Sequence, residues 1–517
     1  MKLRKLIIND IDYKPLMKGL DLFFSKSDIN SIHANCFIGI NGTGKSQVLE
    51  LIAEIFLFLD RAFRKENKPK INFSPFAFKI EYELMIDANE YLVIIVCEKI
   101  KTKEKEINVE VLKKDDNAFI FNIEDFYSYL PNKVIGYTSG DNETLSLPFD
   151  SYYDEYATYT YERAFGKVNG NDYDPKLYFM NYNTNLGIAI SSLIFESEIK
   201  EICKVKKILK INKLESFKLT IQTKQREAPF RKKGGVKLTK ELEDWKMKLI
   251  KCASFQKYNE DFEKYELEYI IDEATIIAFK THFNSALELY TCLYKFELLN
   301  NLIVKNEVKR KIKSERKERR LVTKMPMVAD IDKVLNYSEL KLKLDNEDIV
   351  DYLSLSDGEH QFLNVFGTIL MINQDNCLFL LDEPETHFNP NWRRTFISTL
   401  KLITENRRQD IIMTSHSPFV VSDLDSENVF IFNREGDKIF IYQPSDQTYG
   451  ASFDEILDMA FDIKIPISAD SLNKIEELEK ETDSEIIKNK IVQFGDSVKK
   501  MSLKNRIVLL DSLKEKK

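Results

Sequence analysis

Residues 39–46 read Gly-Ile-Asn-Gly-Thr-Gly-Lys-Ser, a loop that matches the pattern GxxxxGK[ST]. The apolar run at residues 34–40 predicts a buried strand before it, and residues 48–63 repeat apolar side chains at helical spacing after it. Strand, glycine loop and helix form the context in which this pattern binds phosphate, because glycines let backbone N–H groups turn inward around the anion. We therefore expect this stretch to decide the fold, as a P-loop on an α/β sheet.

The residues of the loop have separate expected roles. Lys45 would reach the β- and γ-phosphates, and the Ser46 hydroxyl would bind Mg²⁺. The positive end of the following helix adds to the attraction for phosphate. The backbone cradle would be formed by Asn41, Gly42, Thr43 and Gly44. The expected cofactors are therefore ATP and Mg²⁺.

Two further apolar strands are expected to end in polar residues. Residues 377–383 read CLFLLDE, so Asp382 would stand at a strand end to hold Mg²⁺, and Glu383 would orient or deprotonate the attacking water. Residues 411–416, IIMTSH, end in His416, for which we expect a γ-phosphate contact. Taken alone, an Asp-Glu or a histidine at a strand end is often structural. The presence of a P-loop favours the catalytic interpretation.

A fourth motif precedes an apolar helical run. Residues 353–361 read LSLSDGEHQ, and Ser356 with Gly358 predicts a helix N-cap and an anion site. A plain capped helix would explain this stretch equally well if it stood alone.

These four motifs, in this order, resemble the ABC-type ATPase family and, within it, the branch of SMC, RecF and overcoming-lysogenization-defect ATPases. Residues 382–390, DEPETHFNP, are similar to its Walker B motif and D-loop. The resemblance implies a homodimer or higher homo-oligomer through ATP-bridged heads, in which Ser356, Gly358 and Glu359 contact the nucleotide of the opposite subunit. One departure is that residues 135–143 occupy the place of the Q-loop without its glutamine.

The pattern predicts an α/β fold: an ABC-ATPase head, with a P-loop core sheet and an antiparallel β-subdomain, plus a helical insertion and a helical C-terminal tail. Alternating apolar residues between positions 75 and 125 predict the hairpins of the β-subdomain. The expected parts are residues 1–149 (N-terminal lobe of the head), 150–330 (helical insertion), 331–465 (C-terminal lobe) and 466–517 (tail).

The text of the motifs looks most like the PtuA ATPases of Septu anti-phage defence systems. That resemblance implies a bacterial defence role, in which head dimerisation controls a separately encoded HNH nuclease of the PtuB type. The chain has no CxxC zinc hook, and the residues after His416 lack the acidic motifs of a Toprim nuclease. Two alternatives stay open: a RecF- or SMC-like repair or chromosome-maintenance ATPase without an effector nuclease, and a chain whose insertion is itself a nuclease.

Composition bears on location and on partners. The net charge is −7 and no apolar run is long enough to cross a membrane, so we expect a cytoplasmic protein with no membrane contact. Nucleic acid would have to bind local basic stretches, Lys309–Arg320 and Arg231–Lys233, which could neutralise phosphates or be solvated surface. Apolar residues of the tail could dock a partner, although packing on the chain's own head is the simpler expectation.

Overall fold

The computed structural model describes the chain except for residues 26–33, 69–71, 75, 99–100, 103–106, 115–117, 121–124, 140–143, 196–200, 226–234, 319–325, 327, 406 and 516–517. The described residues form two compact units, Met1–Ala451 and Ser452–Lys517. No helix among them is long and apolar enough to cross a membrane.

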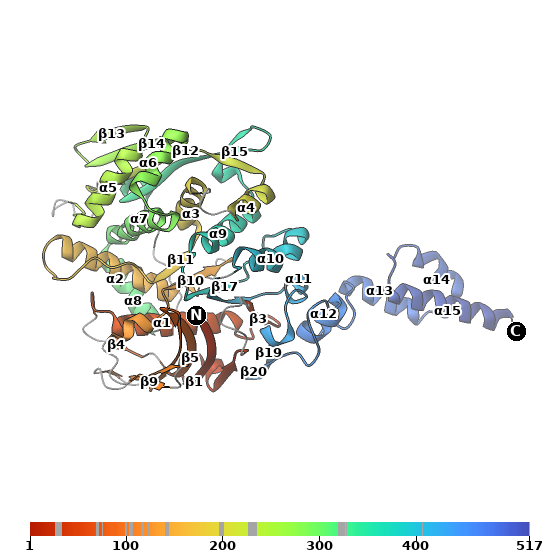
Figure 1. Ribbon diagram of the computed structural model, residues 1–517. Helices are drawn as coiled ribbons and strands as arrows, with labels where there is room; N and C mark the ends of the chain where they lie inside the picture. Colours follow the sequence, from red (N-terminus) through yellow and green to blue (C-terminus); the bar gives the residue numbers. More distant parts are fainter. Residues whose placement is uncertain are drawn as a thin grey trace. The chain divides into compact units, whose positions relative to one another are not determined.

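The first unit is built on a seven-stranded sheet within the described residues (Figure 1). Strands β3 and β18 are buried along their whole length, as expected for parallel strands covered by helices on both faces. The P-loop follows β3, and the neighbouring strands β18 and β17 run parallel to it. In sheet order the strands are β11 (Leu177–Met180), β10 (Lys133–Thr138), β17 (Cys377–Asp382), β18 (Gln409–Thr414), β3 (Ala34–Ile38), β19 (Val429–Glu435) and the antiparallel β20 (Lys438–Tyr442).

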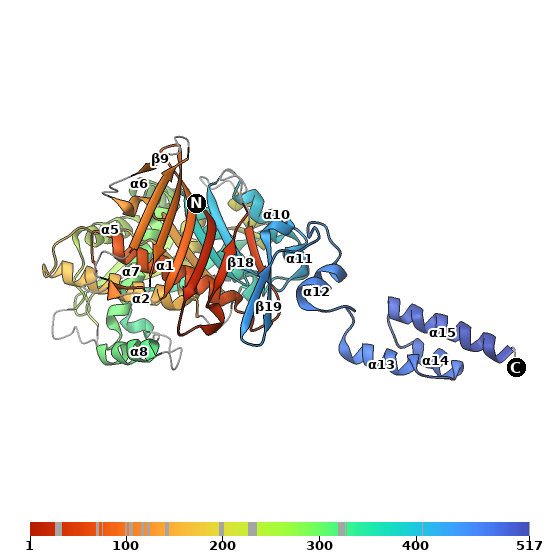
Figure 2. The same cartoon turned by 90° about the horizontal axis from the view of Figure 1, so that it is seen from below.

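An antiparallel sheet forms the expected β-subdomain, and Figure 2 shows its long strands side by side. In β5 the side chains of Phe78, Ile80 and Tyr82 point into the core and alternate with less buried residues, which is the pattern of a sheet covered on one face. The sheet order is β2 (Leu20–Phe23), β1 (Lys2–Asp10), β5 (Ala77–Ile86), β6 (Asn89–Cys97), β8 (Ile107–Lys113) and β9 (Ala118–Ile120), with a separate pair β4 (Asn72–Phe73) and β7 (Lys101–Thr102).

These two sheets confirm the expected α/β head with a helical tail, but the insertion needs correction. Residues 150–330 are mixed, because strands alternate there with helices. The first of these strands, β11, extends the core sheet beside β10. The others join a five-stranded sheet with two strands from the predicted C-terminal lobe, in the order β13 (Phe255–Asn259), β14 (Lys264–Ile270), β12 (Ile211–Gln222), β15 (Leu335–Leu344) and β16 (Ile349–Asp351).

Helices cover these sheets, and α9, which begins at the signature, packs against α3 and α4 of the insertion. The helices of the first unit are α1 (Lys45–Phe63), α2 (Ser146–Ala164), α3 (Tyr182–Ile194), α4 (Ile202–Leu209), α5 (Lys240–Cys252), α6 (Glu273–His282), α7 (Ala286–Leu298), α8 (Asn306–Glu318), α9 (Asp357–Met371), α10 (Pro390–Ile403) and α11 (Pro418–Val421).

The second unit is helical and has a small core of its own. Its helices are α12 (Phe453–Phe461), α13 (Ala469–Glu479), α14 (Ser484–Ile491) and α15 (Val498–Glu515). The apolar residues of the last three pack on one another, and the buried members of this cluster are Ile475, Leu478, Ile487, Ile491 and Leu503. These side chains therefore give the second unit a core of its own.

We expect Gly136→Ala to destabilise the first unit. A Cβ at Gly136 on β10 would lie 2.6 Å from the buried ring of Phe149 and 2.9 Å from that of Phe179. Overpacking of this kind costs about 1–3 kcal/mol, measured as a lower thermal midpoint. The control is Gly495→Ala, since a Cβ there meets no atom within 4 Å. Equal shifts for both variants would contradict this account.

Candidate active site

The P-loop is held tightly by glycine geometry and by its own lysine. Gly39 has a φ of +134°, and a Cβ there would lie 2.2 Å from the carbonyl oxygen of Phe432 on β19. Only glycine allows the loop to approach that strand so closely. The Lys45 ammonium donates to the carbonyls of Gly39 at 2.8 Å and Ile40 at 3.0 Å. The Lys45 side chain therefore lies along the inner side of the loop, where the phosphates would bind.

Asp382 lies at the centre of the site. Its Oδ1 accepts hydrogen bonds from Ser46 Oγ at 2.7 Å and Thr414 Oγ1 at 2.6 Å. Its Oδ2 accepts one from Thr138 Oγ1 at 3.3 Å. The sheet register explains this convergence, because Asp382 stands directly opposite Thr138 on β10 and Thr414 on β18. Three strand ends and the first turn of α1 therefore meet at one carboxylate.

Glu383 follows in a backbone conformation that is rare for a residue with a side chain, with a φ of +50°. Its N–H donates to Thr414 Oγ1 at 3.0 Å. Its carboxylate lies 3.5 Å from His416 Nε2 and accepts a hydrogen bond from Thr386 Oγ1 at 3.1 Å. The structure therefore brings the two predicted catalytic side chains together beside Asp382.

Burial controls the electrostatics of this site. Desolvation lowers the pKa of Lys45 to about 8, although Glu383 and Asp382 pull it upward. Desolvation and the nearby Lys45 also lower the pKa of His416, so its imidazole is neutral at pH 7. The 3.5 Å contact between His416 Nε2 and Glu383 Oε1 is therefore not an ion pair at neutral pH.

The signature residues form the beginning of α9. Ser356 is the N-cap, and its Oγ accepts the backbone N–H of Glu359 while the Glu359 carboxylate accepts the Ser356 N–H at 2.8 Å. Ser356 is exposed, whereas Gly358 is buried with its Cβ position 2.7 Å from the carbonyl of His387. Ser356 at the start of the signature is therefore accessible at the surface, whereas Gly358 packs against the loop after β17.

Several residues of the site carried no recognisable motif of their own. Thr138 and Ser139 stand where the sequence analysis placed an atypical Q-loop, and Ser139 Oγ donates to Thr386 Oγ1 at 3.2 Å. Gln361, two residues after Glu359, bonds to the loop that contains Glu383. The one sequence signal for Thr138 is that it ends a predicted strand, and the structure pairs this strand with the Walker B strand β17.

The described part of the basic stretch Lys309–Arg320 is less available to nucleic acid than the sequence suggested. Lys309 is 8% exposed and its Nζ lies 2.7 Å from Asp154 Oδ1, so this residue is used in an internal ion pair. Ile312 is also buried, and of the neighbouring cations Arg310 and Lys311 are exposed. The side chains from Arg316 onward and Arg231–Lys233 lie outside the described residues. Lys309 therefore cannot contact nucleic acid as part of the basic stretch Lys309–Arg320, and this part of the prediction is corrected.

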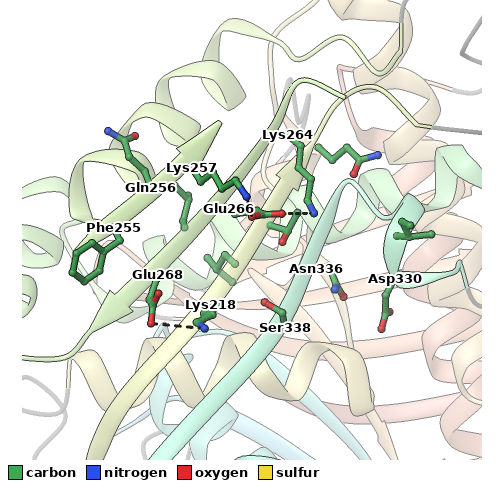
Figure 3. Close-up of a pocket in the computed structure, with 15 residues that line it drawn as sticks. Lys218, Phe255, Gln256, Lys257, Lys264, Glu266, Glu268, Asp330, Asn336 and Ser338 are labelled. Atoms are coloured by element: carbon green, nitrogen blue, oxygen red, sulfur yellow. Dashed lines mark hydrogen bonds and ion pairs between the residues drawn. The ribbon is translucent and has the colours of Figure 1, made fainter. Parts of the chain in front are cut away.

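A second concavity lies on the outer face of the five-stranded sheet and is not part of this site (Figure 3). Its volume is about 470 Å³, and its floor comes from β12, β13, β14 and β15. Figure 3 shows its lysines turned toward its own carboxylates: Lys264 Nζ lies 2.7 Å from Glu266 and Lys218 Nζ lies 3.8 Å from Glu268. Its cations are paired, so it offers little to a phosphate.

Known proteins match this chain in several ways. A family described as an AAA domain, putative AbiEii toxin, type IV toxin–antitoxin system, matches residues 254–422, which include the signature, the Walker B strand and His416. The probable ATPase of retron Vc95 from Vibrio cholerae is 22% identical over 488 residues, which is 88% of this chain and 78% of that protein. The thiamine import ATP-binding protein ThiQ of Photobacterium profundum is 31% identical over 103 residues, covering 20% of this chain and 40% of ThiQ.

Solved structures also show likeness. The match to the SMC head domain from Thermotoga maritima spans 86% of this chain and 100% of that chain, with a TM-score of 0.31 and 11% sequence identity. The sequence matches show that the chain is an ATPase. The narrower resemblance to the PtuA ATPases stays a prediction.

We expect ATP affinity to fall as the pH rises above 8. In the protein alone Lys45 loses its proton near this pH, whereas phosphate oxygens favour the charged ammonium, so binding takes up a proton. The affinity should drop by up to about tenfold per pH unit. Calorimetry in buffers of different ionisation enthalpy measures the uptake. Lys45→Arg, charged throughout, should bind ATP without it. Equal uptake by both proteins would contradict the assignment to Lys45.

Proposed function

We propose that this chain is a Mg²⁺-dependent ATPase subunit of a bacterial anti-phage defence system. The observation that carries the ATPase part is the convergence of Ser46, Thr414 and Thr138 on Asp382, with Glu383 and His416 beside it. In our proposal the P-loop would bind the phosphates, Ser46 and Asp382 would bind the divalent cation, and Glu383 would be the carboxylate base, all within this one region.

The donor set at this point fits Mg²⁺. The cation prefers oxygen ligands and keeps several waters, and the Ser46 hydroxyl and the Asp382 carboxylate offer two oxygens that already lie 2.7 Å apart. When bound, Mg²⁺ would neutralise charge on the phosphates. Ser46 and Asp382 would hold it in our proposal. The hydroxyls of buried Thr414 and half-buried Thr138 would keep the carboxylate in place.

The other residues have roles in the attack of water on the γ-phosphate. Lys45 and the N–H groups of residues 41–44 would stabilise the charge on the phosphates. Glu383 would accept a proton from the attacking water, and neutral His416 would donate its single N–H to the γ-phosphate. Thr386 supports the same carboxylate from its other oxygen.

Dimerisation would complete the site. Ser356 is exposed at the beginning of α9, and the capping box leaves the positive end of that helix facing outward. Such a helix end suits the phosphates of a nucleotide held by a second copy of the chain. In our proposal Ser356, Gly358 and Glu359 form this contact across the dimer.

The defence role and its partner rest on broader support. One relative is the probable ATPase of a retron, and the matching family is described with a toxin–antitoxin system. Both descriptions suit an ATPase that works with a separately encoded effector. We propose an HNH nuclease of the PtuB type as that effector, controlled by ATP-dependent dimerisation of the heads.

Glu383→Gln should lower ATP hydrolysis by at least about 100-fold, because removal of a general base costs this much or more. ATP-bound dimers should accumulate, which size-exclusion chromatography with ATP and Mg²⁺ would detect. Glu347→Gln, a change in an exposed turn, is the control and should hydrolyse ATP normally. Normal hydrolysis by Glu383→Gln would remove this residue from the base role.

The effector is tested by purification of the tagged chain from its native host. We expect a small HNH protein to co-purify, and nuclease activity to appear only when both proteins are present and to change in the Glu383→Gln complex. Recovery of DNA-repair proteins instead would favour the RecF-like alternative. Nuclease activity of the purified chain alone would contradict the two-component proposal.

A further inference from the structure

Gln361 connects three parts of the head through one buried amide. It lies in the second turn of α9, just after the signature, and is 4% exposed. Its Oε1 accepts the N–H of His387 at 3.0 Å, and its Nε2 donates to the carbonyl of Glu383 at 3.5 Å. The buried phenol of Tyr137 on β10 lies beside this side chain. The amide therefore links α9, β10 and the loop after the Walker B strand.

The backbone of Glu383 needs such support. A φ of +50° is costly for a residue with a Cβ, by about 1–3 kcal/mol, and persists only where the surroundings impose it. Here Thr414 accepts the Glu383 N–H on one side, and Gln361 donates to the Glu383 carbonyl on the other. The same carbonyl also accepts the N–H of Thr386 at 3.3 Å and its Oγ1 at 3.0 Å, so Gln361 is one of three donors that fix this peptide and the only one that comes from α9.

The loop that contains Glu383 also packs directly against the signature helix. The Cβ position of Gly358 lies 2.7 Å from the carbonyl of His387, which leaves no room between α9 and the loop. One turn further, the rings of Phe362 and Phe388 lie 5.3 Å apart. A shift of the first two turns of α9 would therefore move the loop and, through the Gln361 amide, the peptide of Glu383.

We propose that Gln361 is a positioning residue that couples the signature to the catalytic carboxylate of the same chain. Contact of Ser356 with the nucleotide of a second copy fixes α9, and Gln361 passes that constraint to Glu383. This inference rests on the proposed function, in which Glu383 is the base and the signature acts across the dimer. Gln361 itself touches neither ATP nor water in this scheme.

The test is Gln361→Leu, which keeps most of the side-chain volume and removes its hydrogen bonds. We expect kcat to fall by about 10- to 100-fold, as displaced catalytic groups do. The Kd for ATP and the formation of ATP-dependent dimers should stay within about threefold of the unmodified chain. A lower kcat with an unchanged KM would show that Gln361 positions the catalytic carboxylate and does not bind the nucleotide.

The matched control is Gln409→Leu. Gln409 is a fully buried glutamine at the start of β18, far along the strand from His416, and its Nε2 donates to the carbonyls of Ile372 at 2.7 Å and Gln374 at 2.9 Å. It should lower the thermal midpoint about as much as Gln361→Leu and leave kcat unchanged. An equal loss of kcat in both variants, or unchanged kcat in Gln361→Leu, would overturn the proposal.

A second variant, Gln361→Glu, isolates the bond to Glu383 and serves if Gln361→Leu does not fold. It keeps an acceptor for the His387 N–H and lacks the amide donor, so kcat should fall at pH 8. As the pH falls, protonation of the introduced carboxyl restores a donor, and the ratio of its kcat to that of the unmodified chain should rise. A ratio independent of pH would overturn the role of this bond. Absence of ATP hydrolysis in the unmodified chain would instead refute the proposed function.

Discussion

The carboxylate of Asp382 is the constraint on which the rest of the head depends. Hydroxyls from α1, β10 and β18 converge on it, because parallel strands in register end at one level of the sheet. The Asp382 carboxylate is half-buried, so the loss of these hydroxyl donors would leave an acceptor that is only partly solvated. The strand order, the position of the P-loop and the geometry of Glu383 are therefore fixed together, and an error in one would leave Asp382 unsatisfied.

The sequence predicted the parts of this head that have local causes. Glycines that approach another backbone, such as Gly39, and apolar strands that end in Asp382 leave recognisable text. Thr138 leaves none, and Gln361 lies in the quoted signature stretch without any sign of its contact to Glu383, because the importance of both residues depends on register and on packing between elements distant in the chain. The same limit explains the insertion: the alternation in residues 211–222 was present, but its pairing with β15 spans more than a hundred residues.

Charge in the sequence also proved to be a poor guide to charge on the surface. Lys295 is fully buried between Asp174 and Glu241, and Lys309 is paired with Asp154. These lysines join parts of residues 150–330 to one another, α7 to α5 and α8 to α2, and are not free for phosphate. Buried pairs of this kind break at considerable cost when one partner is removed. A count of basic residues therefore overstates the surface available for nucleic acid.

The bonds of Lys45 to the carbonyls of Gly39 and Ile40 bear on turnover. A phosphate that reaches this ammonium exchanges one set of acceptors for another, so the net gain from hydrogen bonding is small. When the products leave, the loop's own carbonyls take the ammonium back and no buried cation is left unsolvated. The carbonyl oxygens of Gly39 and Ile40 thus compete with phosphate oxygens for the Lys45 ammonium. This competition weakens the hold on ADP and suits an enzyme that must reset between cycles.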